Sequence, residues 1–148
     1  MHETYMRMAL EEARQAGAEG EVPVGCVIVR EGQVIARGHN RREQSKNALS
    51  HAETEAIRQA CSVMTDWRLS DCTLYVTLEP CPMCAGAILN ARVGTVVYGA
   101  ADPTFGACGG VMNLFEEAFG IHPRLYGGVL AEECGLVLQS FFRDLRKE

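Results

Sequence analysis

Two cysteines in the segment PCPMC have the spacing of a metal-binding pair. Cys81 and Cys84 lie three positions apart, with Pro80 and Pro82 on either side of the first cysteine. On a helix, residues three positions apart share a face, and proline suits the first helical turn. Both sulfurs would then lie at a helix N-terminus, where the helix dipole favours the thiolate that binds metal ions. Taken alone, the pair could equally be a redox couple or half of a structural zinc site.

His51 is the best further ligand among the four histidines of the chain. A structural zinc site uses four protein ligands, whereas a catalytic site uses three and a water molecule. The chain has no second C-x-x-C, so a site of four cysteines would have to use scattered thiols. His51 opens the helical segment HAETEAI, and Ser50 before it is a candidate N-cap. We therefore expect His51, Cys81 and Cys84 to bind zinc, with water in the fourth position.

Glu53 is the predicted proton carrier of this site. It follows His51 by two positions, and residues two apart on a helix do not face each other, so Glu53 is not expected to be another ligand. A carboxylate beside the metal could take a proton from bound water and deliver it elsewhere. An H-x-E pair alone is usually a surface feature. Together with C-x-x-C about 30 residues later, each at the start of a helix, it indicates a working centre.

Strands and helices are expected to alternate along the chain. Apolar residues at helical spacing predict a helix that ends near Gly17, and β-branched runs between turn signals predict strands. The expected strands are 22–29, 33–38, 72–77, 94–100 and 124–130, and the later helices are 51–64, 81–92 and 131–148. The apolar contacts expected of the last helix are Leu136, Phe141, Phe142 and Leu145. This alternation predicts a three-layer α/β fold with a mainly parallel or mixed sheet.

Length and composition indicate an ordinary globular protein. A chain of 148 residues is expected to form one domain over residues 1–148. The charged first segment is not a signal peptide, and no apolar run reaches the roughly 18 residues that a membrane span needs, so we expect a cytoplasmic protein with no membrane partner. Seven cysteines, an odd number, argue against a disulfide framework. A net charge of −5 counts mildly against a nucleic-acid partner.

Five sequence blocks span nearly the full chain in the order EVPVGCVIV, GHN, HAETEAI, LYVTLEPCPMCAGAIL and DPTFGACGG. In spite of the net charge, these blocks resemble those of the bacterial tRNA-specific adenosine deaminases, which belong to the cytidine deaminase-like superfamily. The H-x-E and P-C-x-x-C motifs are the signature of the zinc deaminases, of which the tRNA adenosine deaminases are a standard example. The resemblance implies a three-layer α/β/α fold with a central mixed sheet of about five strands.

The same resemblance implies a hydrolase that converts adenosine to inosine at the wobble position of a tRNA anticodon, one form of RNA editing. His51, Cys81 and Cys84 would hold one Zn²⁺ per subunit, and Glu53 would shuttle the proton. Family members form homodimers, so a homodimer that binds the anticodon stem-loop is expected.

The resemblance also suggests residues that contact the adenine. Asn40 would read the base, because its amide both donates and accepts hydrogen bonds. Pro23 and Val24 would line the base pocket, Ala52 would offer backbone contacts, and Asp102 would lie near the nucleotide. Simpler structural roles stay open: Asn40 as a turn residue, Val24 as part of the core, and Asp102 as a turn acid before Pro103.

The RNA-binding surface is less well marked in the sequence. Many relatives carry a lysine where this chain has Thr104, and the basic C-terminal tail is short. Candidate RNA contacts are Arg41, Arg42 and Arg143, and Phe142 could stack on an unpaired base. An alternative function is deamination of a free nucleobase or nucleotide of the guanine, cytosine or dCMP type. A third reading is a protein without enzymatic activity, with structural zinc or a redox-active Cys81–Cys84 pair.

Overall fold

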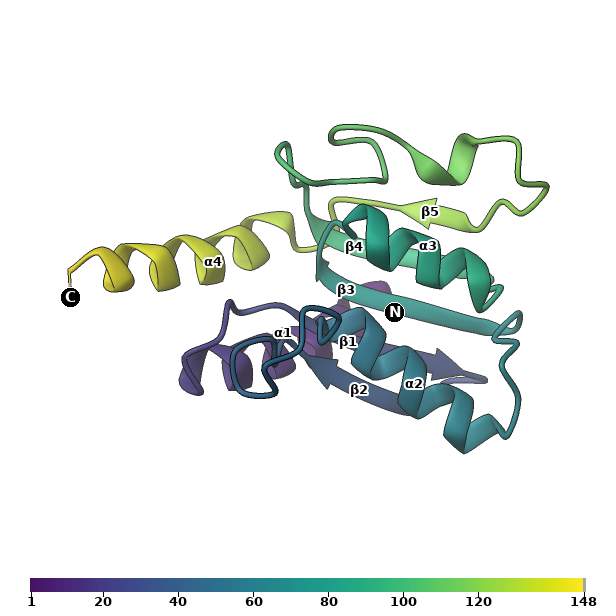
Figure 1. The fold of residues 1–148 in the computed structure, drawn as a ribbon, viewed down its shortest axis with the longest axis horizontal. Coiled ribbons are helices and arrows are strands. Elements are labelled where there is room, and N and C mark those ends of the chain that lie inside the picture. The colour runs from purple at the N-terminus through teal and green to yellow at the C-terminus, as the bar shows by residue number, and fades with distance from the viewer. Residues whose placement is uncertain (148) are drawn as a thin grey trace.

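The protein has a mixed sheet between two layers of helices (Figure 1). The structure is a computed structural model, which describes residues 1–147. Five strands of these residues pair in the order β2-β1-β3-β4-β5. Their bounds are β1 Gly25–Arg30, β2 Gln33–His39, β3 Cys72–Leu78, β4 Thr95–Ala100 and β5 Arg124–Tyr126. Strand β1 is antiparallel to both β2 and β3, whereas β3, β4 and β5 run parallel. The predicted three-layer α/β/α fold with a mixed sheet is confirmed.

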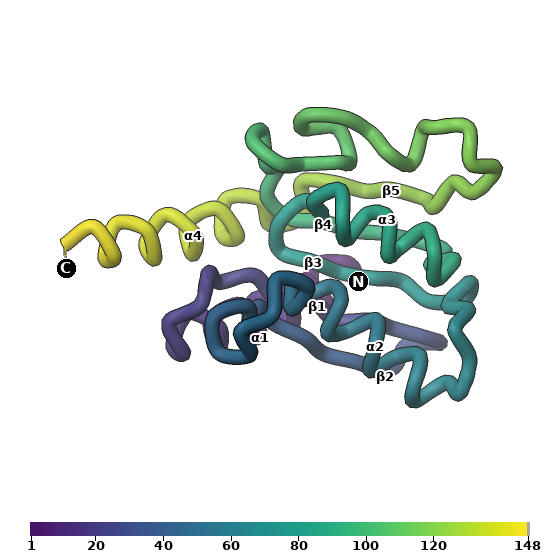
Figure 2. The backbone as a smooth tube through the Cα atoms, in the orientation of Figure 1, coloured from purple at the N-terminus to yellow at the C-terminus, as the bar shows by residue number. Residues whose placement is uncertain are grey.

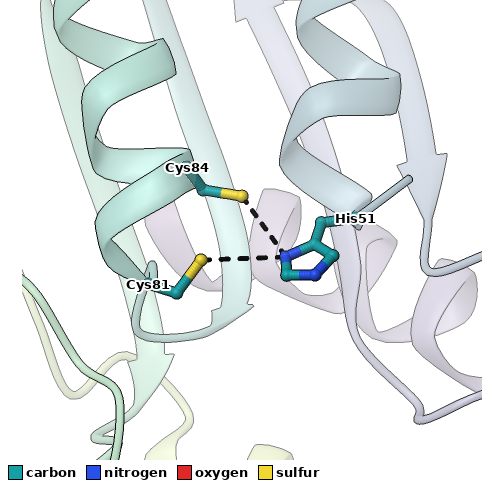
Figure 3. Close-up of side chains that lie close together, drawn as sticks. All are labelled: His51, Cys81 and Cys84. Carbon is teal, nitrogen blue, oxygen red and sulfur yellow. Dashed lines mark hydrogen bonds between the residues drawn. The ribbon is translucent and has the colours of Figure 1, made fainter. Parts of the chain in front are cut away.

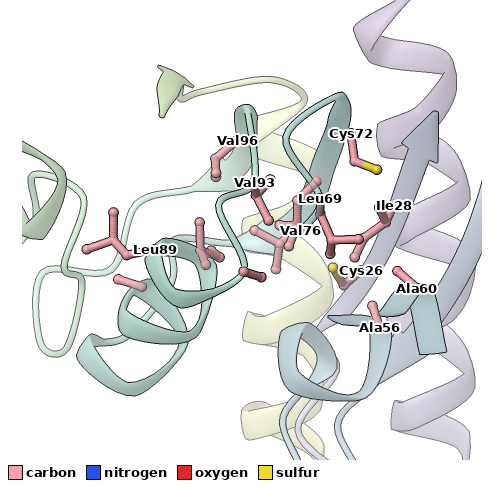
Figure 4. Close-up of a cluster of buried hydrophobic side chains, with 14 of the residues drawn as sticks. Cys26, Ile28, Ala56, Ala60, Leu69, Cys72, Val76, Leu89, Val93 and Val96 are labelled. Atoms are coloured by element: carbon pink, nitrogen blue, oxygen red, sulfur yellow. The ribbon is translucent and has the colours of Figure 1, made fainter. Parts of the chain in front are cut away.

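The helices pack in pairs on the two faces of the sheet. Their bounds are α1 His2–Ala18, α2 Ala52–Met64, α3 Pro82–Asn90 and α4 Ala131–Arg146, and a short 3₁₀ helix, η1, covers Leu114–Glu116. Helices α2 and α3 cover one face of the sheet (Figure 4), and α1 and α4 lie on the other. In the described part of the chain, no helix is long and apolar enough to cross a membrane.

Alternate residues of the central strands fill two separate cores. Ile28 and Val76 point toward α2 and α3, whereas their neighbours Val27 and Tyr75 pack toward α1 and α4. Successive side chains of a strand point to opposite faces, so strands that read as continuous apolar runs are buried on both sides. Each fully buried valine or isoleucine contributes about 1.5–3 kcal/mol to stability. The sheet therefore gives stable support to the loops and helix starts that follow its strands.

Three expected strands are shorter in the structure than predicted from the sequence: β4 lacks only the expected first residue, whereas β1 and β5 differ by more. Strand β1 begins at Gly25 and not at residue 22, because the Val24 N–H donates to the Val22 carbonyl in a local turn. Strand β5 ends at Tyr126, because the chain bends at two glycines. A Cβ atom at Gly127 would lie 2.3 Å from the Tyr98 ring, and Gly128 has a φ of +84°. These local contacts are not visible in a β-branched pattern.

The predicted apolar contacts of the last helix are mostly wrong. Leu136, Phe142 and Leu145 are exposed, and Cys134 is the buried residue of α4. Phe141 is half-buried in a groove between α1 and α4. The reason is the course of α4, which leaves the sheet and extends beyond its end (Figure 2). Its second half, which carries Phe142 and Leu145, has no sheet beneath it in the described chain, so these two side chains stay in contact with solvent.

Candidate active site

Three potential metal ligands meet where helices α2 and α3 begin (Figure 3). The Nδ1 atom of His51 lies 3.8 Å from the Cys81 sulfur and 3.5 Å from the Cys84 sulfur. All three ligand atoms lie within 4.8 Å of one another. Cys84 is buried, whereas His51 and Cys81 are half-buried. The structure therefore brings together the three residues that the sequence suggested as ligands.

The spacing of these atoms fits a tetrahedral zinc ion. Zinc binds sulfur at about 2.3 Å and histidine nitrogen at about 2.0–2.1 Å, so a tetrahedral site separates a nitrogen from a sulfur ligand by about 3.6 Å. The two distances from His51 Nδ1 are 3.5 and 3.8 Å. One imidazole and two sulfurs are also typical zinc ligands. Three protein ligands leave a fourth tetrahedral position open, as in catalytic sites.

Both cysteines are fixed by the first turn of α3. Cys81 is the N-cap residue in an extended conformation, and Pro82 occupies the start of the helix. Proline is favoured there because its missing N–H would have no partner in the helix. Cys84 lies one turn further along the same helix. The free N–H groups and the dipole of the helix end favour negatively charged sulfur at this position.

His51 occupies the N-cap position of α2, so the expected N-cap at Ser50 is wrong. The His51 N–H donates to the Thr54 hydroxyl at 3.0 Å, and the Ser50 hydroxyl donates to the Glu55 carboxylate at 2.5 Å. Ser50 is therefore tied to a side chain of the first helical turn and not to its backbone. The extended backbone of His51 turns the imidazole away from the helix and toward the two sulfurs.

A close approach of α2 to the sheet fixes the distance between the start of this helix and the sheet. At Gly38 of β2, a Cβ atom would lie 2.5 Å from the Ala52 carbonyl oxygen and 2.8 Å from the Ala56 nitrogen. Ala52, Ala56 and Ala60 are fully buried on the face of α2 toward the sheet. Small residues on both α2 and β2 let the helix pack close to the sheet. The position of His51 depends on this packing, because His51 lies at the start of α2.

Hydrogen bonding divides the protons of His51, Cys81 and Cys84 unequally. A hydrogen bond with the Cys84 thiol, aided by His51, lowers the pKa of Cys81 to about 4. The pKa of Cys84 is raised, because this thiol bonds to the Cys81 sulfur and is buried. The pKa of His51 is raised by its hydrogen bond with Cys81. The site therefore attracts positive charge, whether a proton or a metal ion.

Glu53 lies in the first turn of α2 and is almost completely buried. Burial raises its pKa to about 7, with a further increase from the negative charge of Cys81. A carboxyl group with such a pKa exchanges protons readily near neutral pH. Glu53 is close enough to Cys81 and Cys84 to interact with both, and it lies outside the group of three potential ligands. Its role as proton carrier stays a prediction.

The residues expected to bind the base lie in different environments. Asn40 is buried; its amide nitrogen donates to the Val22 carbonyl at 3.4 Å, and its oxygen accepts from the Arg42 N–H at 3.2 Å. Asn40 therefore has the local turn contacts that the simpler reading required, while one amide N–H and one oxygen lone pair remain for another partner. Val24 packs against the core below α2 and α3.

Three further expected contacts also have structural roles here. Pro23 is buried, and its side chain lines the groove beside α4. Ala52 is fully buried with its carbonyl against Gly38. Asp102 Oδ1 accepts the N–H groups of Thr104 at 3.0 Å and Phe105 at 3.1 Å, as a turn acid does. Contact of these residues with a base stays a prediction.

The expected RNA contacts come from two separate elements. Arg41 and Arg42 are exposed in the loop between β2 and α2, near the helix start that carries His51. Phe142 and Arg143 lie on the projecting half of α4, where Phe142 is exposed and packs edge to face on Phe141. All four side chains can be reached by a large partner.

Two buried carboxylates escaped the sequence interpretation. Glu21 accepts the N–H groups of Glu43 and Gln44 at 3.1 and 2.7 Å, and Glu79 accepts three N–H groups of the loop after β4. Glu79 stands inside the apolar block LYVTLEPC, and Glu21 directly precedes the apolar residues of EVPVG. An acid in such a block is the one signal that could have marked them, since a buried charge needs partners.

Comparisons with known protein families, sequences and structures all give deaminases as relatives. The family model of the MafB19-like deaminases matches residues 1–146. A tRNA-specific adenosine deaminase of Bacillus subtilis (strain 168) is 52% identical over 147 residues, which cover 99% of this chain and 91% of the relative. A solved structure from studies of A-to-I editing by tRNA:A34 deaminases has a TM-score of 0.88 and 43% identity, over 91% of this chain and 99% of that one.

A second activity occurs among the similar structures. A guanine deaminase from Bacillus subtilis has a TM-score of 0.67 and 34% identity, over 100% of this chain and 95% of that chain. Its likeness in both measures is lower than that of the A34 deaminase structure.

Proposed function

This chain belongs to the family of the tRNA-specific adenosine deaminases, and we propose that it converts the wobble adenosine of a tRNA anticodon to inosine. The reaction is a hydrolysis: water replaces the amino group on the purine ring, and ammonia leaves. The observation that carries the proposal is the meeting of His51, Cys81 and Cys84 beside the buried Glu53, in a chain 52% identical to such an enzyme.

We assign one Zn²⁺ per subunit to His51, Cys81 and Cys84, because their atoms have the spacing and chemistry of a three-ligand site. When bound, the zinc ion would supply a water molecule made more acidic and held for attack on the ring carbon. Glu53 would hold the proton from this water, give it to the ring nitrogen beside that carbon, and assist the departure of ammonia. Its burial keeps bulk water from competing for the proton.

We further propose that Asn40 reads the adenine edge with its remaining amide hydrogen and oxygen lone pair. Pro23, Val24 and Asp102 would shape the base pocket, together with the backbone of Ala52. Arg41, Arg42, Phe142 and Arg143 would contact the anticodon stem-loop, and their exposure supports this assignment. A homodimer in the cytoplasm is the proposed form of the enzyme.

The Glu53→Ala variant tests the proposed chemistry. Purified protein with zinc is incubated with an anticodon stem-loop that carries a wobble adenosine, and inosine is detected because it is read as guanosine in cDNA. The wild-type protein should convert this adenosine. Glu53→Ala should keep its zinc and lose about 10²–10⁴-fold in rate, since only the proton carrier is removed. A wild-type protein with full zinc that leaves the adenosine unchanged would refute the proposed function.

Deamination of a free base is the second candidate, favoured by the likeness to a guanine deaminase. A panel of free bases, nucleosides and nucleotides distinguishes the two activities. Rapid turnover of guanine or cytosine, with none on RNA, would favour this alternative. A protein isolated without metal, whose Cys81–Cys84 pair exchanges with thioredoxin, would instead support a redox role.

A further inference from the structure

Glu79 is a buried carboxylate outside the proposed metal site and two residues before Cys81. It is 2% exposed, at the point where the chain leaves β3. Its Oε1 accepts the N–H of Asp102 at 3.0 Å, and its Oε2 accepts those of Cys108 at 2.9 Å and Gly110 at 2.8 Å. A buried charge is costly unless it is hydrogen-bonded, and bonds to an ionised acceptor are about twice as strong as neutral ones. Glu79 therefore holds this loop firmly.

The loop of residues 101–113 is built around this carboxylate. A Cβ atom at Gly106 would lie 2.2 Å from Glu79 Oε2, and one at Gly110 would lie 2.9 Å from Oε1. The absence of a side chain at both positions lets the backbone close around the carboxylate. No other residue type would fit without moving either the loop or Glu79.

The same contacts join the loop to the turn that carries the metal ligands. The Ala107 N–H donates to the Pro80 carbonyl at 2.8 Å, next to Cys81 in the sequence. The Glu79 N–H donates to the Ala100 carbonyl at 2.9 Å, where the loop begins. The loop and the Cys81 turn are therefore one connected unit, with Glu79 at its centre.

The outer side of this loop presents groups that a partner could contact. Phe105, Val111 and Met112 are 65%, 61% and 41% exposed. Asp102 Oδ1 holds the N–H groups of Thr104 and Phe105, so the turn that carries Phe105 is formed in advance. These three exposed side chains belong to one short loop, and an exposed aromatic ring such as that of Phe105 can stack on an unpaired base.

We propose that Glu79 is a positioning residue for the RNA substrate: it fixes loop 101–113 against the Cys81 turn, so that Asp102 and Phe105 lie ready for the nucleotides around the target adenosine. This inference rests on the proposed function, because it takes RNA as the substrate. Glu79 acts through the loop, and neither binds the metal nor transfers a proton.

Glu79→Gln tests this role with little change in size. Oε2 accepts two N–H groups, whereas glutamine offers one oxygen and places an NH₂ group against at least one of the three donors. The variant should keep the zinc content of the wild-type protein. Amide hydrogen exchange at Asp102, Cys108 and Gly110, measured by NMR, should become at least about tenfold faster, as expected for the loss of one charge-assisted bond.

Steady-state kinetics on the anticodon stem-loop give the functional readout. In Glu79→Gln, KM should rise about tenfold, with a smaller change in kcat, because a loop that must be ordered during binding reduces affinity. Glu79→Asp keeps the charge but is one methylene shorter, so its KM should lie between those of the wild type and Glu79→Gln. Gly106→Ala should raise KM as well, because its Cβ pushes the loop away from an intact Glu79.

Val97→Ala is the control for a general loss of stability. Val97 is fully buried in the core beneath α1 and α4, on the face of the sheet away from the metal ligands. It should lower the unfolding temperature without changing KM or exchange at the three amides. Two results would overturn this inference and leave the proposed function intact. One is loss of zinc from Glu79→Gln; the other is a KM of Glu79→Gln equal to that of a wild-type protein with normal turnover. A wild-type protein that neither binds nor deaminates the stem-loop would overturn the proposed function first.

Discussion

At the scale of single residues, the proposed metal site depends on which of the seven cysteines lie close enough to His51 to bind the same ion. Cys81 and Cys84 do, while the others, such as Cys134, lie as separate free thiols in the cores or at their edges. A thiol buried in an apolar core behaves as a small hydrophobic group. Its replacement by alanine costs packing but leaves a distant metal site intact.

Cys84→Ala and Cys134→Ala separate these two roles. Both remove a buried thiol, yet only Cys84→Ala removes a proposed ligand. We expect Cys84→Ala to lose zinc, measured by mass spectrometry of the metal, and to lose deaminase activity. Cys134→Ala should keep both.

Metal binding should also stabilise the folded chain. A ligand that binds only the folded state raises stability, by about 2.7 kcal/mol at a hundred times its dissociation constant. A chelator should therefore lower the unfolding temperature of the wild-type protein and of Cys134→Ala, but not of Cys84→Ala. An equal effect of the chelator on all three proteins would contradict the assigned ligands.

At the scale of elements, the start of α2 depends on contact with β2. Gly38 lies where any side chain would meet the backbone of Ala52 and Ala56. The helix start carries both His51 and Glu53, so displacement of α2 would act on the proposed ligand and the proposed proton carrier together.

Gly38→Ala should therefore reduce stability and zinc affinity at once. Overpacking typically costs about 1–3 kcal/mol, measured by denaturant unfolding, and here the obstacle is backbone that cannot rotate away. The matched control is Gly135→Ala in α4, where a Cβ atom meets no heavy atom within 4 Å. This change should raise stability by about 0.5–1 kcal/mol, because alanine is the better helix former. If Gly38→Ala behaved like Gly135→Ala, the close helix approach would not be needed.

At the scale of the whole molecule, α4 is an arm that leaves the body of the protein. Its exposed apolar residues contribute little to the core, and its last turn carries Arg143 and Arg146. A projecting helix with basic and aromatic groups could reach parts of an RNA that lie away from the proposed metal site.

Phe142→Ala tests this use of α4. Because Phe142 is 41% exposed and has no sheet beneath it, its loss should change the free energy of unfolding by no more than about 0.5–1 kcal/mol. KM for the stem-loop should rise, since base stacking on an aromatic ring is worth about 1–3 kcal/mol. Leu145→Ala, at a similarly exposed apolar position of the same helix, should leave KM nearly unchanged. Equal KM values for Phe142→Ala and the wild type would remove Phe142 from the RNA surface.

Much of the fold could be predicted because its signals are local. The apolar run around Ile28 and the small-residue helix after Cys81 have lengths and periods that a single segment displays. Errors arose where a distant contact decides the outcome. Strand β5 stops where Gly127 meets Tyr98, and Phe142 and Leu145 of α4 stay exposed because the sheet ends before the helix does.

The sequence by itself determined the chemistry available to this protein: a C-x-x-C pair and an H-x-E pair, each at the start of a helix, in blocks that resemble a deaminase family. Only the tertiary structure decided that His51 and Cys84 lie 3.5 Å apart and that Glu79 ties a remote loop to the Cys81 turn. Helix starts and the periodicity of apolar residues depend on residues that are neighbours in the sequence. Contacts between distant segments depend on how the whole sheet and its helices pack, which no short segment encodes.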